Sequence, residues 1–135
     1  MKERVLFLCT HNSARSQMAE GLLRQMAGDR FDVRSAGTEA TAVQPLAIEA
    51  MRELGIDISG HTSKALDVFY GQPFDFVITV CDRAKESCPL FPGRGERIHW
   101  SFDDPAAATG TDAERLEAFR RVRDAIRARL REFAG

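Results

Sequence analysis

Short apolar runs along the chain predict strands. Residues 4–8 (RVLFL) and 75–80 (DFVITV) are dominated by β-branched and aromatic side chains and have the length of strands buried in a sheet. Residues 31–35 alternate apolar and polar side chains, and residues 97–100 (RIHW) carry a weaker strand pattern. The run at 75–80 is the clearest of these, and it ends directly before a cysteine.

Apolar side chains at intervals of three and four residues predict helices between these strands. One such pattern covers residues 16–27 and ends at a glycine. A second covers residues 45–54, where Pro45 suits the first helical turn and Gly55 the position after the last. A shorter helix is expected to begin near Thr62.

The C-terminal part of the chain predicts one long helix that begins after Thr111. Thr111 and Glu114 have the spacing of a capping box, in which each side chain accepts a hydrogen bond from a free backbone N–H. Arginines interspersed with acidic residues occupy the opposite face, which we interpret as solvated surface rather than a nucleic-acid site. The apolar stripe of this helix consists of Leu116, Phe119, Val122, Ile126, Leu130 and Phe133.

Strand and helix patterns alternate, which predicts the α/β class with a parallel sheet covered on both faces. Length and composition fit one domain over residues 1–135, since the chain is 44% hydrophobic. The net charge of −1 indicates neither a nucleic-acid partner nor a membrane partner. Without a long apolar run or a signal-peptide pattern, we expect a soluble, cytoplasmic protein. The three cysteines are few, and their number is odd, which does not fit the disulfide framework of a secreted protein.

A cysteine and an arginine flank a run of small polar residues where the first strand ends. The stretch CTHNSARS starts at Cys9 and contains Arg15. In parallel sheets ligands bind beyond the carboxyl ends of strands, where backbone N–H groups and helix N-termini attract anions. A guanidinium matches two oxygens of a tetrahedral oxyanion, and positive groups of this kind favour a thiolate. We therefore predict attack by Cys9 sulfur on a phosphate-like oxyanion; the alternative is a buried cysteine before an ordinary loop.

The stretch VLFLCTHNSARSQMAE resembles the phosphate-binding loop of the low-molecular-weight protein tyrosine phosphatases. The resemblance continues through SAGT, ISGHTSKAL, DFVITVCD and FDDPA. It implies a single three-layer α/β/α domain with a four-stranded parallel sheet. The loop departs from the commonest family pattern at two positions, where glycine and cysteine are usual. Histidine tolerates left-handed backbone angles better than most residues, so we expect the loop to keep its shape, with its histidine at the surface. The substrate-binding residues implied are Thr10, His11, Asn12, Ser13, Ala14, Arg15 and Ser16, of which His11 and Ala14 are the departures.

Two further cysteines follow the clearest strand, in the stretch CDRAKESCP. Cys81 should share a sheet edge with Cys9, because the carboxyl ends of parallel strands meet there. After Cys9 bonds to an oxyanion, Cys81 can attack Cys9, so that electrons leave with the reduced oxyanion, and Cys88 can then attack Cys81. Arsenate can be reduced in this way and phosphate cannot. The alternatives are ordinary core cysteines, or a zinc site with a nearby histidine, which lacks a recognisable ligand spacing.

This arrangement resembles the thioredoxin-coupled arsenate reductases of the same fold, which serve arsenic detoxification. The resemblance implies that Cys9 is the nucleophile, that Cys81 releases arsenite, and that Cys88 completes an outer disulfide for thioredoxin to reduce. We expect no cofactor and no metal site. A helix over residues 81–88 would hold the two outer Cα atoms about 10.5 Å apart, whereas a disulfide needs roughly 7 Å or less. We therefore expect the segment to loop out or unwind on oxidation.

The resemblance assigns supporting roles to three more side chains. Asp104 matches the general acid that protonates the leaving oxygen, although Asp103 competes for this role and either carboxylate can instead cap a turn before proline. Ser16 matches a hydroxyl that stabilises the thiolate, and Asn12 matches a residue that braces the loop.

Lys64 stands where some relatives carry an acidic residue beside a bound potassium ion. The ion's other neighbours in those relatives match Asn12, Glu20, Ser35 and Thr62. We expect the ammonium group of Lys64 to replace the charge of the ion, which makes bound potassium doubtful.

Two other functions fit part of the pattern. A small phosphatase acting on phosphotyrosine would use the same loop, but DDPAAATG offers alanines where such enzymes usually carry aromatic residues, and the only tyrosine is Tyr70. A redox sensor or oxyanion-binding module would keep the loop without needing Asp104. We expect a monomer without nucleic-acid or membrane partners, reduced by thioredoxin or another thiol carrier.

Overall fold

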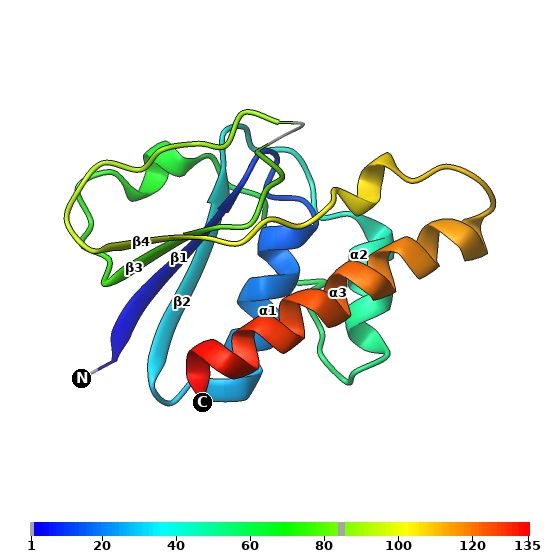
Figure 1. Ribbon diagram of the computed structural model, residues 1–135, viewed down its shortest axis with the longest axis horizontal. Coiled ribbons are helices and arrows are strands. Elements are labelled where there is room, and N and C mark those ends of the chain that lie inside the picture. The colour runs from blue at the N-terminus through cyan, green and yellow to red at the C-terminus, as the bar shows by residue number, and fades with distance from the viewer. Residues whose placement is uncertain (1, 84–85) are drawn as a thin grey trace.

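The computed structural model describes residues 2–83 and 86–135. Figure 1 shows a sheet at one end and a group of helices beside it. The elements in chain order are β1 (Glu3–Cys9), α1 (Arg15–Ala27), β2 (Phe31–Gly37), α2 (Pro45–Arg52), the 3₁₀ helix η1 (Leu66–Phe69), β3 (Phe76–Thr79), β4 (Glu96–His99), the 3₁₀ helix η2 (Pro105–Ala107) and α3 (Asp112–Ala134).

The described residues form a four-stranded sheet in the order β2-β1-β3-β4, with every neighbouring pair parallel. This confirms the predicted α/β class and its four-stranded parallel sheet. In the register Cys9 lies opposite Gly37 of β2, and Leu8 lies opposite Thr79 of β3. The ends of the three strands therefore meet at one edge, where the loop after β1 begins.

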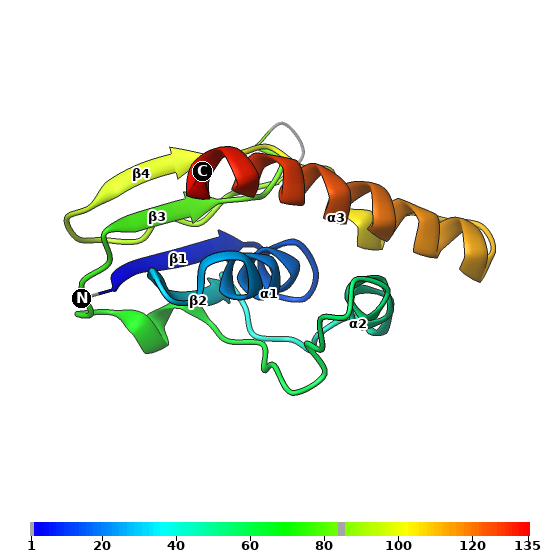
Figure 2. The same cartoon turned by 90° about the horizontal axis from the view of Figure 1, so that it is seen from below.

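The side chains of β1 alternate between two apolar clusters, one on each face of the sheet. Phe7 is fully buried in the larger cluster, with residues of α1, α2 and α3. Leu6 and Leu8 are fully buried in the smaller one, which includes Leu66 and Phe69 of η1. Figure 2 shows α1 and α3 next to each other, with η1 (green) apart from both. Both faces are covered as expected, but the second only by η1 and loop residues.

The long helix α3 starts as predicted. The Thr111 hydroxyl accepts a hydrogen bond from the Glu114 amide, and the Glu114 carboxylate accepts one from the Thr111 amide, each at 3.1 Å. Phe119 and Ile126 of the apolar stripe are fully buried. The arginine face is not wholly solvated, because Arg123 is buried and donates to the Ala50 carbonyl of α2 at 2.7 Å.

Two predicted helices differ from those observed. The helix expected near Thr62 is wrong in its start: residues 61–64 are not helical, and only Leu66–Phe69 forms a 3₁₀ turn. The physical reason is that the backbone here bonds to other segments, since the Lys64 amide donates to the Asn12 side chain and the Lys64 carbonyl accepts from Gly37. Helix α2 ends at Arg52, and Gly55 takes the expected left-handed conformation with φ 76°. Within residues 2–83 and 86–135, no helix is long and apolar enough to cross a membrane.

Candidate active site

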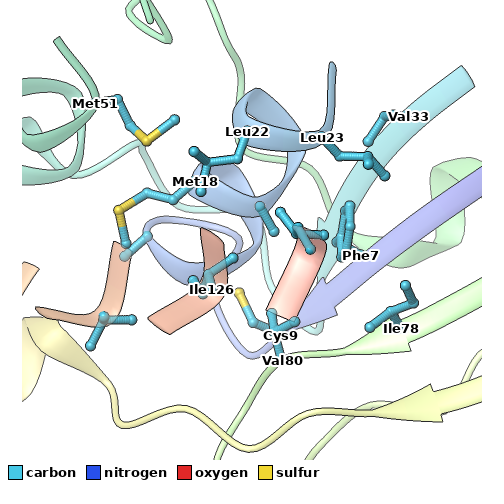
Figure 3. Close-up of a cluster of buried hydrophobic side chains, with 14 of the residues drawn as sticks. Phe7, Cys9, Met18, Leu22, Leu23, Val33, Met51, Ile78, Val80 and Ile126 are labelled. Atoms are coloured by element: carbon cyan, nitrogen blue, oxygen red, sulfur yellow. The ribbon is translucent and has the colours of Figure 1, made fainter. Parts of the chain in front are cut away.

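Residues 9–16, here called the oxyanion loop, connect β1 to α1 at the carboxyl edge of the sheet. Cys9 is 2% exposed, and Figure 3 shows it at the end of β1 beside Val80, within the core that contains Met18 and Ile126. Its sulfur lies 2.8 Å from the hydroxyl oxygen of Ser16 in the first turn of α1. The loop therefore presents a buried sulfur, with a hydrogen-bonding hydroxyl, at the N-terminus of a helix.

Asn12 holds the oxyanion loop from inside. Its side-chain amide donates to the Ser16 hydroxyl at 2.8 Å and to the Ser35 hydroxyl at 3.0 Å, and its carbonyl oxygen accepts from the Lys64 amide at 2.8 Å. Among the described residues it alone combines a side chain with a left-handed φ, of 50°. His11 does not take that angle; it is exposed, and only its backbone carbonyl is bound, by the hydroxyl groups of residues 41 and 63.

Gly37, at the end of β2, lies directly against the backbone of the loop. A Cβ atom at this position would sit 2.7 Å from the Asn12 nitrogen and 2.8 Å from the Thr10 carbonyl oxygen. Both distances are shorter than any ordinary contact, so only glycine lets the two segments approach. The glycine of the SAGT stretch thus fixes the position of the loop from the neighbouring strand.

The guanidinium group of Arg15 lies close enough to Cys9 for the two to interact electrostatically. The residue is 2% exposed, and its two terminal nitrogens donate to the carboxylate of Glu86 at 2.5 and 2.7 Å. It also donates to the Phe102 carbonyl at 3.2 Å, and it lies 3.9 Å from the carboxylate of Asp104. Burial by itself would lower the pKa of Arg15, but the hydrogen bond to Glu86 and the neighbouring negative charges raise it above its ordinary value.

Glu86 is a site residue that the sequence reasoning missed. Besides the two bonds from Arg15, its carboxylate accepts from the Thr10 hydroxyl at 2.7 Å and from the Asp82 amide at 2.9 Å. The hydrogen bond from Arg15, followed by those from Asp82 and Thr10, lowers the pKa of Glu86 to about 2 against the opposing effect of burial. The only available signal was an acidic residue two positions before Cys88.

Cys81 and Cys88 form a disulfide whose Cα atoms are 6.0 Å apart. Cys81 is fully buried and belongs to the same core cluster as Cys9, and Cys88 packs against that cluster. Residues 81–83 and 86–88 are not helical, in keeping with the looped-out form expected after oxidation. Residues 84 and 85 of that segment lie outside the described part of the chain. In this form neither disulfide sulfur is free to bind zinc.

Asp104 caps a turn and also faces the oxyanion site. One carboxylate oxygen caps η2 by accepting from the Ala106 amide at 3.0 Å, and the other faces Arg15. Asp103 is exposed. A groove of about 700 Å³ adjoins the site here, and among the described residues the only aromatic side chain that lines it is Phe102. Geometry therefore favours Asp104 over Asp103 and offers little to hold a tyrosine ring.

A second polar network lies behind the oxyanion loop. Gln17 donates to the Asn12 side chain at 2.9 Å and lies 3.0 Å from the ring of His61. Lys64 donates through its ammonium group to the Thr62 carbonyl at 2.6 Å, and burial lowers the pKa of Lys64. Burial also lowers the pKa of His61. Gln17 and His61 were not among the predicted site residues; nothing in their spacing distinguishes them from ordinary polar positions.

Comparison with known proteins agrees with this geometry. Residues 4–135 match the family described as low molecular weight phosphotyrosine protein phosphatase. An arsenate reductase of Halalkalibacterium halodurans is 53% identical over 133 residues, which are 98% of this chain and 96% of the relative. The solved structure of an arsenate reductase in the phosphate binding state is 36% identical, with a TM-score of 0.82 over 97% of this chain and 95% of that one. A thioredoxin-dependent arsenate reductase of Corynebacterium glutamicum is 31% identical, with a TM-score of 0.67 over 97% of this chain and 61% of that one.

Proposed function

The chain belongs to the low molecular weight phosphotyrosine protein phosphatase family, and we propose that it acts there as an arsenate reductase that draws its electrons from thioredoxin. The observation that carries this proposal is the disulfide between Cys81 and Cys88, formed in the same core cluster as Cys9. A phosphatase needs one cysteine, whereas a reductase that changes the oxidation state of arsenic needs a route for two electrons.

In the first step the thiolate of Cys9 attacks arsenic in a bound arsenate, a sulfur–arsenic bond forms, and an oxygen leaves as water. Arg15 supplies a buried, bidentate contact for two arsenate oxygens, and backbone N–H groups of the oxyanion loop supply others. Ser16 holds the sulfur at 2.8 Å. Asp104, 3.9 Å from Arg15, lies at the rim of the same space and serves as the acid that protonates the leaving oxygen.

In the second step Cys81 attacks the sulfur of Cys9. A disulfide forms between them, the sulfur–arsenic bond breaks, and its electron pair stays on arsenic, which leaves as arsenite. Cys88 then attacks Cys81, and Cys9 leaves as a thiolate. The Cys81–Cys88 disulfide is the product of this third step, and two thiols of thioredoxin reduce it by exchange.

The supports for thioredoxin are the thioredoxin-dependent relative and the place of Cys88. Cys88 is half-buried, whereas Cys9 and Cys81 are buried, so Cys88 is the sulfur that an external dithiol reaches first. Thioredoxin operates where thiols are kept reduced, which supports a reaction in the cytoplasm.

The test is arsenite production with thioredoxin, thioredoxin reductase and NADPH, for the wild type and for Cys88→Ser. We expect continuous turnover by the wild type and at most one arsenite per molecule from Cys88→Ser, which stops at the Cys9–Cys81 disulfide. Ser87→Ala is the matched control, because Ser87 is exposed next to Cys88 but carries no sulfur; it should turn over like the wild type.

Other results would contradict the proposal in recognisable ways. Hydrolysis of an aryl phosphate without arsenite production would make the chain a phosphatase of its family. Neither activity, with oxyanion binding intact, would make it a sensor or a binding module. Continuous turnover by Cys88→Ser would remove Cys88 from the relay while leaving arsenate reduction in place.

A further inference from the structure

The carboxylate of Glu86 occupies the donors that the oxyanion loop offers to a ligand. Arg15 presents both terminal nitrogens to it, at 2.5 and 2.7 Å, and the Thr10 hydroxyl donates to one of its oxygens at 2.7 Å. Glu86 is 71 residues from Arg15 along the chain and belongs to residues 81–88, here called the redox segment, whose two ends the disulfide joins. A side chain from the redox segment is thus bound in the site by the residues that would hold a substrate.

A carboxylate in this position resembles a bound oxyanion chemically. Arsenate, phosphate and sulfate also bind arginine through two oxygens that face the guanidinium group. Charge-assisted hydrogen bonds of this kind are about twice as strong as those between neutral groups. Arg15 is buried, so it has no second face on which to bind an oxyanion while Glu86 holds both nitrogens. Occupation by Glu86 and occupation by substrate therefore exclude each other at Arg15.

The disulfide keeps this carboxylate close. Cys81 follows β3 and is fully buried, and the bond from Cys81 to Cys88 closes a short loop whose ends are 6.0 Å apart at Cα. Glu86 lies two residues from the Cys88 end. A group on so short a tether has an effective concentration of about millimolar or more, so it competes with free anions at similar concentrations. Reduction opens the loop, so Glu86 is then held near the site only by the backbone that connects it to Cys81.

Glu86 also stays charged under ordinary conditions. Its hydrogen bond from Arg15 lowers its pKa to about 2, so the carboxylate is ionised throughout the neutral range. The Asp82 amide, which donates to it at 2.9 Å, belongs to the same redox segment and turns the carboxylate toward Arg15.

We propose that Glu86 is an internal competitor for the oxyanion site, and that it excludes oxyanions from the site while Cys81 and Cys88 are joined. The inference rests on the proposed function, since it gives the relay an order: an oxidised molecule does not bind a second arsenate until its disulfide is reduced. Closing the disulfide brings Glu86 onto Arg15, and reduction of the disulfide releases it. Cys9, left as a free thiol after the third step, is then shielded from a new oxyanion until the two outer cysteines can act again.

The test measures binding of inorganic phosphate, which the relay cannot reduce, by isothermal titration calorimetry. Each variant is prepared with the Cys81–Cys88 disulfide and Cys9 as its one free thiol, and again fully reduced. Glu86→Gln removes the charge of the side chain, and Glu86→Ala removes the whole carboxyl group. Glu49→Gln is the matched control, since Glu49 is exposed on α2.

The oxidised wild type should bind phosphate at least about tenfold more weakly than the reduced wild type, the factor expected when one charge-assisted hydrogen bond has to be displaced. Oxidised Glu86→Ala should bind within about twofold of its reduced form, Glu86→Gln should fall between, and Glu49→Gln should keep the wild-type ratio.

Equal affinity of the two wild-type redox forms would overturn the proposal, and so would a ratio that survives in Glu86→Ala. Absence of phosphate binding in every form would overturn both this proposal and the proposed function. A single-turnover assay with arsenate separates the two: reduced wild type that shows the redox-dependent phosphate affinity but forms no arsenite would refute the reductase and leave the competitor standing.

Discussion

The oxyanion loop and the segment from Cys81 to Cys88 meet at one edge of the sheet but are held by different means. Asn12 and Ser16 fix the loop through buried hydrogen bonds, and Gly37 abuts its backbone so closely that no side chain fits between. The redox segment contains no helix or strand in its described residues, and a disulfide and the contacts of Glu86 hold it. The oxyanion loop is thus built to keep one shape. The segment from Cys81 to Cys88 is instead held partly by a disulfide, which the reaction makes and breaks.

This difference follows from what each region does in the proposed reaction. Arsenate needs its donors in place before it arrives, because donors that must reorganise give up part of their stabilisation of the transition state. Cys88, in contrast, has to approach Cys81 after arsenite has left. Glu86 is the one described side chain of residues 86–88 that bonds directly to the loop, so it couples the two regions.

The largest effect is expected from Arg15→Lys, which changes the oxyanion loop at the residue that also binds Glu86. A lysine keeps the charge but loses the bidentate fork, so kcat/KM for arsenate should fall by about 10²–10³, as when one oxyanion donor is removed. Thioredoxin-dependent reduction of a preformed Cys81–Cys88 disulfide, measured separately, should stay near the wild-type rate. Arg121→Lys, at the exposed rim of the groove, is the control. An unchanged kcat/KM in Arg15→Lys would mean that the fork does not contact arsenate.

Two substitutions at Asn12 test how rigidly the oxyanion loop is held. Asn12→Ala loses buried bonds to Ser16 and Ser35 and keeps the left-handed backbone strain, so it should lower the free energy of unfolding by about 3 kcal/mol. Asn12→Gly loses the same bonds without the strain, so it should cost about 1 kcal/mol less. Urea denaturation of the reduced proteins measures both. Equal costs would show that the backbone angle at residue 12 relaxes and that the loop is less fixed than we infer.

Sequence patterns predicted the oxyanion loop better than the contacts of the neighbouring segment from Cys81 to Cys88. The end of a buried strand located Cys9, and the short polar run before Arg15 located an anion site, because both depend on residues close together in the chain. The same reasoning placed Cys81 at the edge shared with Cys9. The capping box at Thr111 was predicted for the same reason, since it involves neighbours only.

What the sequence left out depends on contacts between distant segments. Glu86 contacts Arg15 across 71 residues, and no periodicity predicts which carboxylate meets a given arginine. The helix expected near Thr62 fails because Lys64 bonds to Asn12 in the folded chain, which overrides local propensity. Arg123 was assigned to a solvated face, yet it is buried against α2, a contact that only the packing of two helices creates.

The Cys81–Cys88 disulfide should raise the free energy of unfolding. Oxidation should leave that free energy unchanged in a chain that cannot form the disulfide. Closing a loop of this length lowers the entropy of the unfolded chain, which corresponds to about 2 kcal/mol in the free energy of unfolding. Urea denaturation of oxidised and reduced wild type gives the difference. Cys81→Ser, treated identically, should show none, because without Cys81 neither the Cys81–Cys88 disulfide nor a Cys9–Cys81 disulfide can form. A wild-type difference near zero would mean that strain in the folded segment offsets the gain.

The smallest effect concerns the carboxylate that connects the two regions. Because the pKa of Glu86 is lowered to about 2, its ion pair with Arg15 stabilises the oxidised protein at pH values above the ordinary carboxyl pKa of 4.5 and is lost as the pH falls from there toward 2. The expected loss is about 1–2 kcal/mol after allowing for partial exposure of the pair.

Glu53 has a pKa lowered to about 2 by its hydrogen bonds from Arg120 and Arg123, so it contributes a similar acid dependence in every variant. The measurement is therefore a difference: urea midpoints of oxidised wild type and oxidised Glu86→Gln, from neutral pH down through this window. The two curves should converge as the pH falls. The reduced proteins should differ less at every pH, because without the disulfide the segment that carries Glu86 is less restrained beside Arg15. Curves that stay parallel in the oxidised proteins would show that Glu86 does not join the redox segment to the oxyanion loop.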